Sequence, residues 1–187
     1  MDESKQEIME ATYSALCEHG YAELSIQKIA DKSDKGKSAI YYHYTDKEEL
    51  MLAFIDYMIE QMEEKHRKLE KLRPEKQLDE TLEMALGMKD DEMWEFRKAM
   101  IEMQAQAPKN EDFRKKFRKT DSMMVENIAQ MLEDLEAEKP GEKAEIIVSC
   151  IEGSVTRKLS TGKRSELEDL KQDIKNIIGQ HLAQPKN

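Results

Sequence analysis

Residues that end helices or form tight turns are scarce in this chain. Its 187 residues include seven glycines and four prolines, and none of these lies between Lys37 and Arg73. Sheet proteins need more turns, and more β-branched and aromatic side chains, than this composition supplies. Charged residues make up 37% of the chain, which suits long helices with one solvated face. We therefore expect an all-α protein with about nine helices.

The overall charge limits the partners that the chain can bind. Forty Asp and Glu against thirty Lys and Arg give a net charge of −10, which argues against a protein coated in nucleic acid, so any basic site must be local. No apolar run approaches the roughly 20 residues that span a bilayer, and the N-terminus lacks the order of a signal peptide. Cys17 and Cys150 stand far apart, which fits buried thiols in a reducing compartment. We expect a soluble, cytoplasmic protein with no membrane partner.

The N-terminal region predicts three helices. Apolar residues at helical spacing mark a helix over residues 5–19, which Gly20 ends. Ser25 can cap a short second helix. The stretch "SDKGKS" then separates it from a third short helix over residues 37–44.

The rest of the chain predicts longer helices. Asp46 and Glu49 have the spacing of a capping box, which indicates the start of a long fourth helix with an apolar stripe. The turn-rich stretches that divide the remaining helices are residues 87–91, 107–110, 138–142 and 160–164.

A capped short helix, a turn and a second short helix make a helix-turn-helix, whose second helix enters the major groove of double-stranded DNA. Ile40 and Tyr44 lie four residues apart and would face the core, so Tyr41 and Tyr42 would face outward. Tyrosine suits packing against a sugar and donating to a phosphate. The run "YYHY" can also be interpreted as ordinary core beside a solvated face. The candidate DNA contacts are Ser25, Gln27, Lys37, Ser38, Tyr41, Tyr42, His43 and Lys47.

These candidates have different expected roles. Lys37 and Tyr42 would read base edges, whereas Tyr41, His43 and Lys47 would contact phosphates. The segment from Ser25 to Lys47 holds five lysines and three aspartates, a net charge of +2, while the other residues sum to −12. Each neutralised phosphate adds about −0.9 to the slope of log affinity against log salt. We therefore expect a shallow salt dependence.

The stretch "IQKIADKSDKGKSAIYYHYTDKEEL" resembles the DNA-binding signature of the TetR (tetracycline-repressor-like) family of transcriptional regulators. In that signature an Ile-Ala pair precedes a turn and a run of the form Leu-Tyr-x-His/Tyr-Phe, followed by Ser/Asn-Lys-Glu-Glu-Leu. The resemblance covers about residues 5–60. The matching positions are Ile29, Ala30, Ile40, Tyr41, His43, Lys47 and Leu50.

The departures from the signature lie mostly in the turn. Asp34, Lys35 and Gly36 stand where the family usually has Gly, a hydrophobic residue and a capping Ser. Aspartate tolerates the left-handed conformation, and glycine is an acceptable though weaker cap. Tyr44 replaces the usual Phe, and Asp46 replaces the usual capping Ser or Asn. These changes bear on DNA affinity rather than on the fold.

The resemblance implies a homodimeric repressor that leaves a pseudo-palindromic operator when a small apolar or acyl-type effector binds. It implies a helix-turn-helix DNA-binding domain over residues 1–47 and a helical ligand-binding and dimerisation domain over residues 48–187. No cofactor is expected.

Methionine and aromatic residues crowd the middle of the chain. Methionine fills irregular space and accepts varied apolar partners, although at helical spacing an ordinary core explains most of these residues. The resemblance implies a ligand cavity between the middle helices. Its candidate residues are Met84, Met88, Trp94, Met100, Met103, Phe117 and Met124.

The last two predicted helices carry apolar stripes that have two interpretations. They can close the core of the chain itself, or they can form a helix pair that meets its copy in a homodimer, which small residues near Gly153 would favour. The candidate interface residues are Ile147, Ile151, Ser154, Val155, Ile174 and Ile178.

Other function classes have less support. A di-iron bundle enzyme needs two Glu-x-x-His pairs, and the chain offers one, Glu63 and His66. We expect neither catalysis nor a metal site. The basic run 113–119 is interpreted as a solvated helix face, or else as a contact for a ligand anion or DNA. The alternative function is a helical module that binds a small molecule or a protein without contacting DNA.

Overall fold

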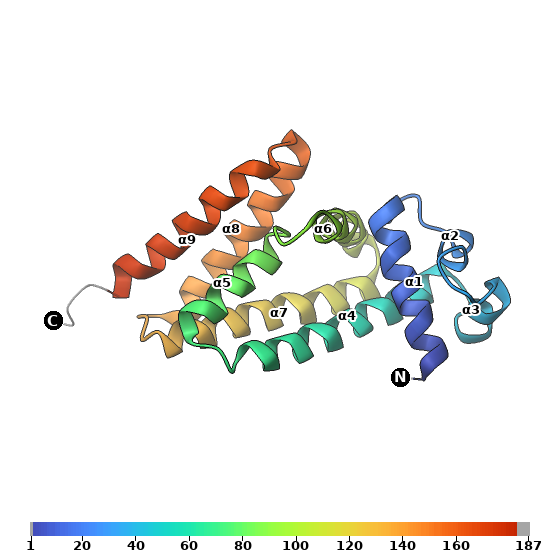
Figure 1. Cartoon of the computed structure of the whole chain (residues 1–187), viewed down its shortest axis with the longest axis horizontal. Coiled ribbons are helices and arrows are strands. Elements are labelled where there is room, and N and C mark those ends of the chain that lie inside the picture. Colours follow the sequence, from blue (N-terminus) through green and yellow to red (C-terminus); the bar gives the residue numbers. More distant parts are fainter. Residues whose placement is uncertain (1, 183–187) are drawn as a thin grey trace. The chain divides into compact units, whose positions relative to one another are not determined.

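The computed structural model describes the backbone of residues 2–182 and the side chains of residues 2–176. Within that range the chain is helical and has no strand, which confirms the prediction of an all-α fold with about nine helices (Figure 1). No described helix is both long and apolar enough to cross a bilayer. The helices are α1 (Glu3–His19), α2 (Ile26–Ala30), α3 (Lys37–His43), α4 (Lys47–Leu69), α5 (Pro74–Ala85), α6 (Asp91–Gln104), α7 (Glu111–Asp134), α8 (Pro140–Thr161) and α9 (Leu167–Leu182), with 3-10 turns at Ala107–Lys109 and Arg164–Glu166.

The chain forms two compact units, and each is made of two segments. Unit 1 holds Met1–Glu63 and Asp91–Arg118, whereas unit 2 holds Glu64–Asp90 and Lys119–Asn187. Unit 1 therefore contains α1, α2, α3 and α6, most of α4 and the start of α7. We call α1, α2 and α3, with the loops between them, the head. The expected functional boundary after residue 47 stays a prediction.

Local sequence signals set the helix ends in unit 1. Gly20 ends α1 with φ 69°, and its N–H donates to Leu16 O at 2.9 Å, as predicted. The Asp46 carboxylate accepts from Glu49 N at 2.9 Å. In a capping box the Glu49 carboxylate would accept from the N–H of the N-cap residue Asp46. Here it accepts instead from the preceding residue, Thr45 N, at 2.7 Å. The long helix α4 therefore begins where the pattern indicated.

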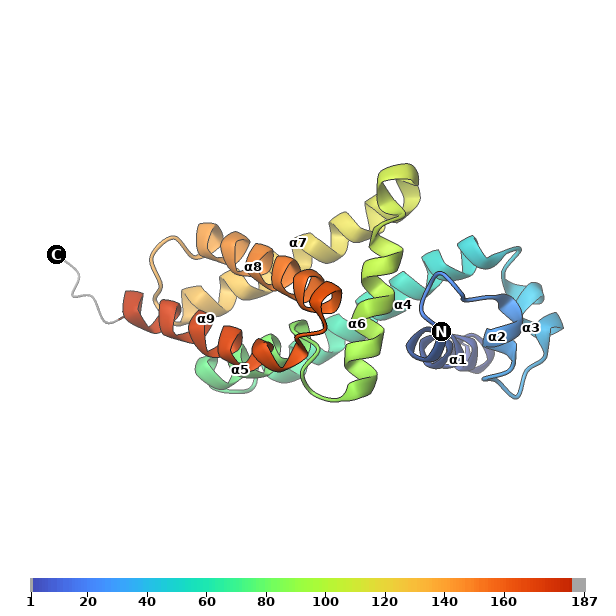
Figure 2. The same cartoon turned by 90° about the horizontal axis from the view of Figure 1, so that it is seen from above.

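The core of unit 1 joins the head to helices that come later in the chain. α1 packs against both α2 and α6, and in Figures 1 and 2 these helices lie side by side. The Phe96 ring of α6 lies 4.8 Å from the Tyr13 ring of α1 and 6.3 Å from the Phe54 ring of α4, between centroids. The head thus buries part of its apolar surface against a helix that lies outside the expected DNA-binding domain. Its fully buried residues include Ile8, Ala15, Leu16, Ile29 and Ile40.

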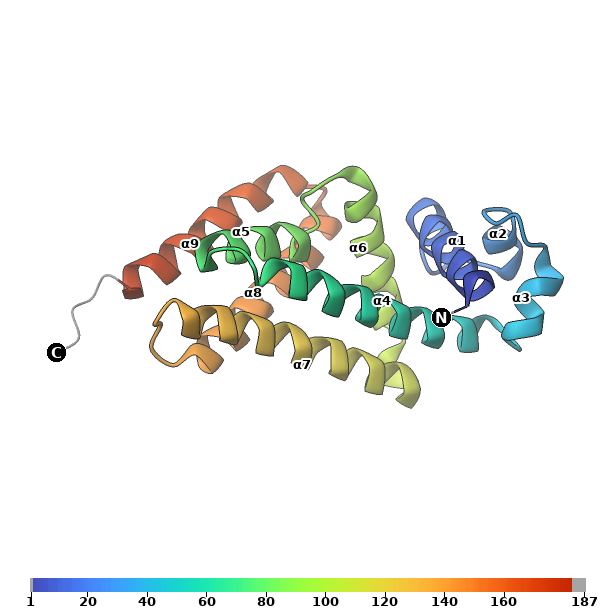
Figure 3. The same ribbon diagram turned by 60° about the horizontal axis from the view of Figure 1, so that its bottom comes forward.

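Unit 2 holds α9 through ion pairs with α5. Lys171 is 6% exposed, and its Nζ donates to Glu83 Oε1 at 2.6 Å, while Lys175 Nζ donates to Asp79 Oδ1 at 2.6 Å. The hydrogen bonds from Lys175 and then Lys171 lower the pKa of Asp79. Figure 3 shows α5 beside α9, and α8 packs against α9.

Candidate nucleic-acid interface

Side chains fix the backbone of the helix-turn-helix. Ser25 Oγ accepts from Lys28 N at 3.3 Å and so caps α2. In the turn, Ser33 Oγ accepts from Lys35 N at 2.9 Å and donates to Glu7 Oε1 at 3.0 Å. Since Glu7 lies on α1, the first helix holds the turn that positions α3.

The short helix α3 has distinct inner and outer faces. Ile40 is fully buried and Tyr44 is 7% exposed, whereas Tyr41 is 54% and Tyr42 84% exposed. The expected orientation of these residues is confirmed. Lys37, the first residue of α3, is also exposed. The outer face therefore presents two phenol rings and an ammonium group to solvent, next to exposed Ser38.

His43 is half-buried between aromatic neighbours at the end of α3. Its ring lies 5.0 Å from the Tyr42 ring and 6.2 Å from the Tyr44 ring, between centroids. Gln27 is exposed on α2 and donates from Nε2 to Asp31 Oδ1. Both side chains keep hydrogen-bonding capacity for a phosphate, because imidazole has two ring nitrogens and a primary amide has two N–H groups.

Lys47 has a structural contact that the sequence did not indicate. Its Nζ donates to the carbonyl oxygen of Tyr21 at 2.9 Å and lies 4.3 Å from the centroid of the Tyr21 ring. Burial, and secondarily the charge of Lys28, lower the pKa of Lys47. An ammonium group has three N–H donors, so this contact leaves two of them for a phosphate.

Most lysines of the head are already paired with glutamates. Lys28 Nζ lies 3.3 Å from Glu23 and Lys35 Nζ lies 3.5 Å from Glu7. Lys32 pairs with Glu18, and the hydrogen bond from Lys32 lowers the pKa of that carboxyl group. Exposed Lys37 makes no ion pair within the described part of the chain. The net positive charge offered to a phosphate is therefore smaller than the lysine count indicates.

The expected effector residues divide between the two units. Met103 and Phe117 are buried, and the other five are half-buried. Trp94, Met100, Met103 and Phe117 belong to unit 1, whereas Met84, Met88 and Met124 belong to unit 2. Two shallow clefts in unit 1, of about 340 and 280 Å³, are lined by other residues. The effector site stays a prediction.

The expected interface residues are largely used by the chain itself. Ile151 and Val155 are fully buried, and Ile147 and Ile174 are 7% and 4% exposed; Ser154 is half-buried. Ile178 lies outside the residues whose side chains are described. The exposed face of α8 carries instead Ile146, which is 63% exposed, with Ser149, Cys150 and Gly153. The apolar stripe in the sequence did not show which face of α8 is buried by the chain itself and which is exposed.

The remaining candidates fit structural roles. Within residues 2–176, no three His, Cys, Asp or Glu side chains gather as a metal site would require, and His66 of the single Glu-x-x-His pairs with Glu70 at 3.4 Å. In the basic run 113–119, Lys115 pairs with Asp112, and Lys116 pairs with Asp56 of α4 at 2.5 Å. These pairs support the interpretation of that run as a helix face that compensates nearby acids.

Comparisons with known proteins identify the fold and the head. The family model of bacterial regulatory proteins of the tetR family matches residues 8–54. A crystal structure of a TetR transcription regulator from Haloarcula marismortui is 30% identical, with a TM-score of 0.83 over 97% of this chain and 99% of that one. The HTH-type transcriptional repressor AcnR of Corynebacterium efficiens is 24% identical over 170 residues, 87% of this chain and 85% of the repressor.

A further solved structure agrees in fold. A TetR-family regulator from Rhodococcus is 20% identical, with a TM-score of 0.75 over 97% of this chain and all of that one. The comparisons do not favour the alternative function, a helical module that binds a small molecule or a protein without contacting DNA. The match over the head, the outward tyrosines of α3 and the full-length similarity to the Haloarcula regulator all agree: this chain belongs to the TetR family of DNA-binding transcriptional regulators.

Proposed function

We propose that this protein is a repressor that binds a pseudo-palindromic operator as a homodimer and leaves it when a small apolar molecule binds. The observation that carries the proposal is the outer face of α3, where Tyr42 is 84% exposed while Ile40 of the same helix is fully buried. Tyr41 and Tyr42 form a pair of adjacent exposed aromatic side chains, and exposed apolar patches are typical of surfaces that bind a partner. The name of the Corynebacterium relative, a transcriptional repressor, supports repression over activation.

The proposed DNA contacts follow from exposure and chemistry. Lys37 and Tyr42 stand five residues apart on α3, about 1.4 helical turns, and read base edges in the major groove. Tyr41 and Lys47 contact phosphates, and His43 adds a phosphate contact from the end of the same helix. Ser25, Gln27 and Ser38 add polar contacts that fix the register of the head on the duplex.

The homodimer contact is proposed for the exposed face of α8. Ile146 leaves a large apolar side chain in solvent at 63% exposure. Gly153 follows two turns later on that helix, and nothing lies within 4 Å of the position that a side chain there would take. A second copy of α8 can therefore approach closely around Gly153 and cover Ile146. The two recognition helices would then read half-sites related by a two-fold axis.

Release by an effector requires only that the effector prefers one of two states of the protein. A coupling of about 1 to 3 kcal/mol gives roughly 5- to 150-fold weaker operator binding. An apolar or acyl-type compound suits the methionines at residues 84, 88, 100, 103 and 124, because thioether side chains adapt to varied apolar shapes.

Selection of bound duplexes from a random pool, at low salt, tests the proposed function. The selected sequences should contain two inverted half-sites, and affinity for them should fall when an effective apolar compound is added. Tyr42→Ala should alter the selected half-site, whereas Tyr57→Ala, a change of the same residue type on α4, should not. A wild-type protein that enriches no duplex would contradict the proposal.

A further inference from the structure

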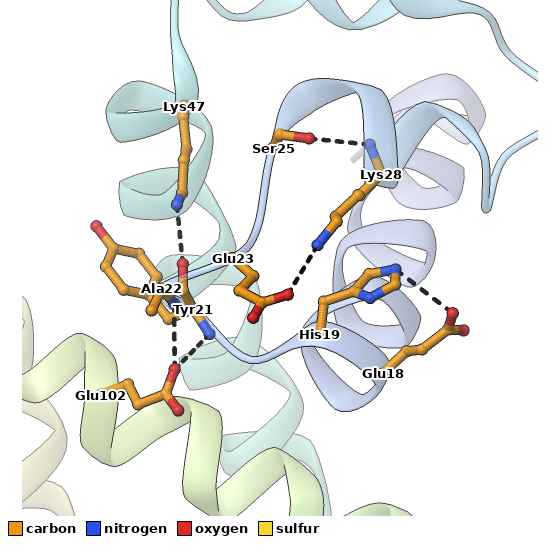
Figure 4. A network of polar contacts seen from close by, with 9 residues as sticks. All are labelled: Glu18, His19, Tyr21, Ala22, Glu23, Ser25, Lys28, Lys47 and Glu102. Carbon is orange, nitrogen blue, oxygen red and sulfur yellow. Dashed lines mark hydrogen bonds and ion pairs between the residues drawn. The ribbon is translucent and has the colours of Figure 1, made fainter.

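The loop between α1 and α2 is held by side chains from two later helices. Glu102 Oε2, on α6, accepts from Tyr21 N at 2.8 Å and from Ala22 N at 3.1 Å. Lys47 Nζ, at the start of α4, donates to Tyr21 O at 2.9 Å. Figure 4 shows Tyr21 between these two side chains. The amide of Tyr21 thus donates to a side chain from α6, and its carbonyl oxygen accepts from Lys47 as well as from Leu24 N at 3.3 Å.

Gly20 makes room for the carboxylate of Glu102. A Cβ built on Gly20 would lie 2.9 Å from Glu102 Oε2, closer than real Cβ atoms come to other heavy atoms. Gly20 also has φ 69°, in the left-handed region where glycine is unstrained. The residue that ends α1 therefore also permits α6 to reach the loop.

The ring of Tyr21 is held as well. The Lys47 ammonium lies 4.3 Å from its centroid, within the range of a cation–π contact. The Tyr21 ring and the Phe113 ring of α7 are nearly perpendicular, at an interplanar angle of 83°, with centroids 6.3 Å apart. Burial, with the charge of Glu48, raises the pKa of the Tyr21 hydroxyl. Three helices of unit 1 thus fix one residue of the head.

The contact between Glu102 and the loop is sensitive to small movements of α6. Charge-assisted hydrogen bonds are roughly twice as strong as neutral ones, but they weaken steeply with distance. If α6 moved about 1 Å away from the loop and the Glu102 side chain kept its conformation, both contacts would lengthen beyond hydrogen-bond distance. The chain enters α6 at Asp91 directly from the segment of unit 2 that ends at Asp90. Because Glu102 lies on the same helix, a movement of the start of α6 can displace Glu102 as well.

We infer that Glu102 is a positioning residue that couples α6 to the head: its carboxylate holds the Tyr21 loop, and through Tyr21 the ammonium of Lys47, in the arrangement that binds operator DNA. The inference rests on the proposed function, because it says that the contact between Glu102 of α6 and the α1–α2 loop affects the affinity for an operator. Loss of the carboxylate frees the loop and removes the fixed acceptor that orients Lys47. Operator affinity then falls although Glu102 does not touch DNA.

Three variants test this role. Glu102→Ala removes the acceptor, and Glu102→Gln keeps the size and one oxygen acceptor but not the charge. Glu95→Ala is the matched control, because Glu95 lies on the same helix and pairs within it, with Lys98 Nζ at 3.2 Å. Fluorescence anisotropy measures the Kd for the selected operator. Hydrogen exchange of the Tyr21 and Ala22 amides reports the contact itself, independently of DNA.

We expect the Kd of Glu102→Ala to rise about tenfold, equivalent to about 1.4 kcal/mol, with faster exchange of both amides. The Kd of Glu102→Gln should lie between those of Glu102→Ala and wild type, and the Kd of Glu95→Ala should stay within about twofold of the wild-type value. Gly20→Ala should weaken binding more in the wild-type background than together with Glu102→Ala, because the close contact requires the carboxylate.

The outcomes separate this inference from the proposed function. A wild-type protein without a preferred duplex would contradict the proposed function, and with it the coupling to operator binding. If the wild type binds a preferred operator and Glu102→Ala binds it equally well, the coupling is absent while the proposed function stands. Unchanged amide exchange in Glu102→Ala would also overturn the inference. If Glu102→Ala does not fold, Glu102→Gln is used as the test instead. The inference would then be overturned if Glu102→Gln exchanged the two amides faster than wild type but bound the operator with the same Kd.

Discussion

The pairing of head lysines with glutamates predicts how operator affinity depends on salt. A lysine that keeps its glutamate adds no net positive charge beside a phosphate, so it releases no counterion from DNA. Of the five lysines in the segment from Ser25 to Lys47, Lys37 and Lys47 lack a glutamate partner among the contacts described. Four such lysines in a dimer, at about −0.9 each, give a slope of about −3.6 for log affinity against log salt.

The perturbation is to free two further lysines in each head. Glu7→Gln and Glu23→Gln together remove the partners of Lys35 and Lys28 and keep the size of the side chains. Partly exposed ion pairs contribute little, about 0 to 1 kcal/mol each at the surface, and a glutamine at residue 7 keeps an oxygen that can accept the hydrogen bond from Ser33. The fold should therefore tolerate both changes. If both freed lysines reach phosphates, the dimer neutralises eight phosphates and the slope approaches about −7.

The assay is a series of operator Kd values between about 50 and 200 mM salt. The matched control is Glu64→Gln with Glu142→Gln, which removes the same charge from ion pairs in unit 2 and should leave the slope near that of wild type. A wild-type slope as steep as −10 would refute the count of available lysines. An equal slope for wild type and the head variant would refute the view that the glutamates compete with phosphate.

Three further predictions follow from the positions of single residues. Tyr41→Ala should weaken binding to operator and random DNA alike, whereas Tyr42→Ala should relax sequence preference by about 1–3 kcal/mol; the same uniform loss for both would contradict their separate roles. Ile146→Glu should give folded monomers, whereas Ile151→Glu should unfold the protein because that side chain is fully buried; an unchanged elution volume for Ile146→Glu would remove the exposed face of α8 from the interface. Hydrogen bonds from the α9 lysines lower the pKa of Asp79 below its usual 3.8, so around that pH the folded state binds fewer protons than the unfolded chain. The stability that Asp79 contributes is therefore present above about pH 4 and lost as pH falls through the lower folded pKa. Asp79→Asn should make the melting temperature fall less steeply in that acid range, and a melting temperature that falls as steeply as in wild type would contradict this role of Asp79.

Local signals explain why the helices and the recognition helix were predictable. The end of α1 at Gly20 and the start of α4 at Asp46 depend on residues within a few positions of each other. The outward direction of Tyr41 and Tyr42 follows from helical period once Ile40 is assigned to the core. Such features need no knowledge of distant parts of the chain.

Contacts between distant segments could not be predicted in the same way. Glu102 lies 81 residues after Tyr21 and sits in a helix with several other acids, so nothing local distinguishes it from Glu95. An apolar stripe shows that a helix face is buried, but it does not say whether the covering surface is the same chain or a second copy. Ile151 is covered by its own chain, whereas Ile146 on the same helix is 63% exposed, so the presence of an isoleucine does not show which face of α8 is buried.

The discontinuous make-up of unit 1 matters for anyone who wishes to exchange DNA specificity between regulators. A transplant of residues 1–63 alone would leave behind Phe96, which covers Tyr13 and Phe54, and Glu102, which satisfies two amides of the α1–α2 loop. Those surfaces would meet whatever side chains the recipient happens to offer. A chimera that keeps the head and its supporting helices intact should therefore carry residues 91–118 as well. It then has three junctions with the recipient chain: one after residue 63, one before residue 91 and one after residue 118.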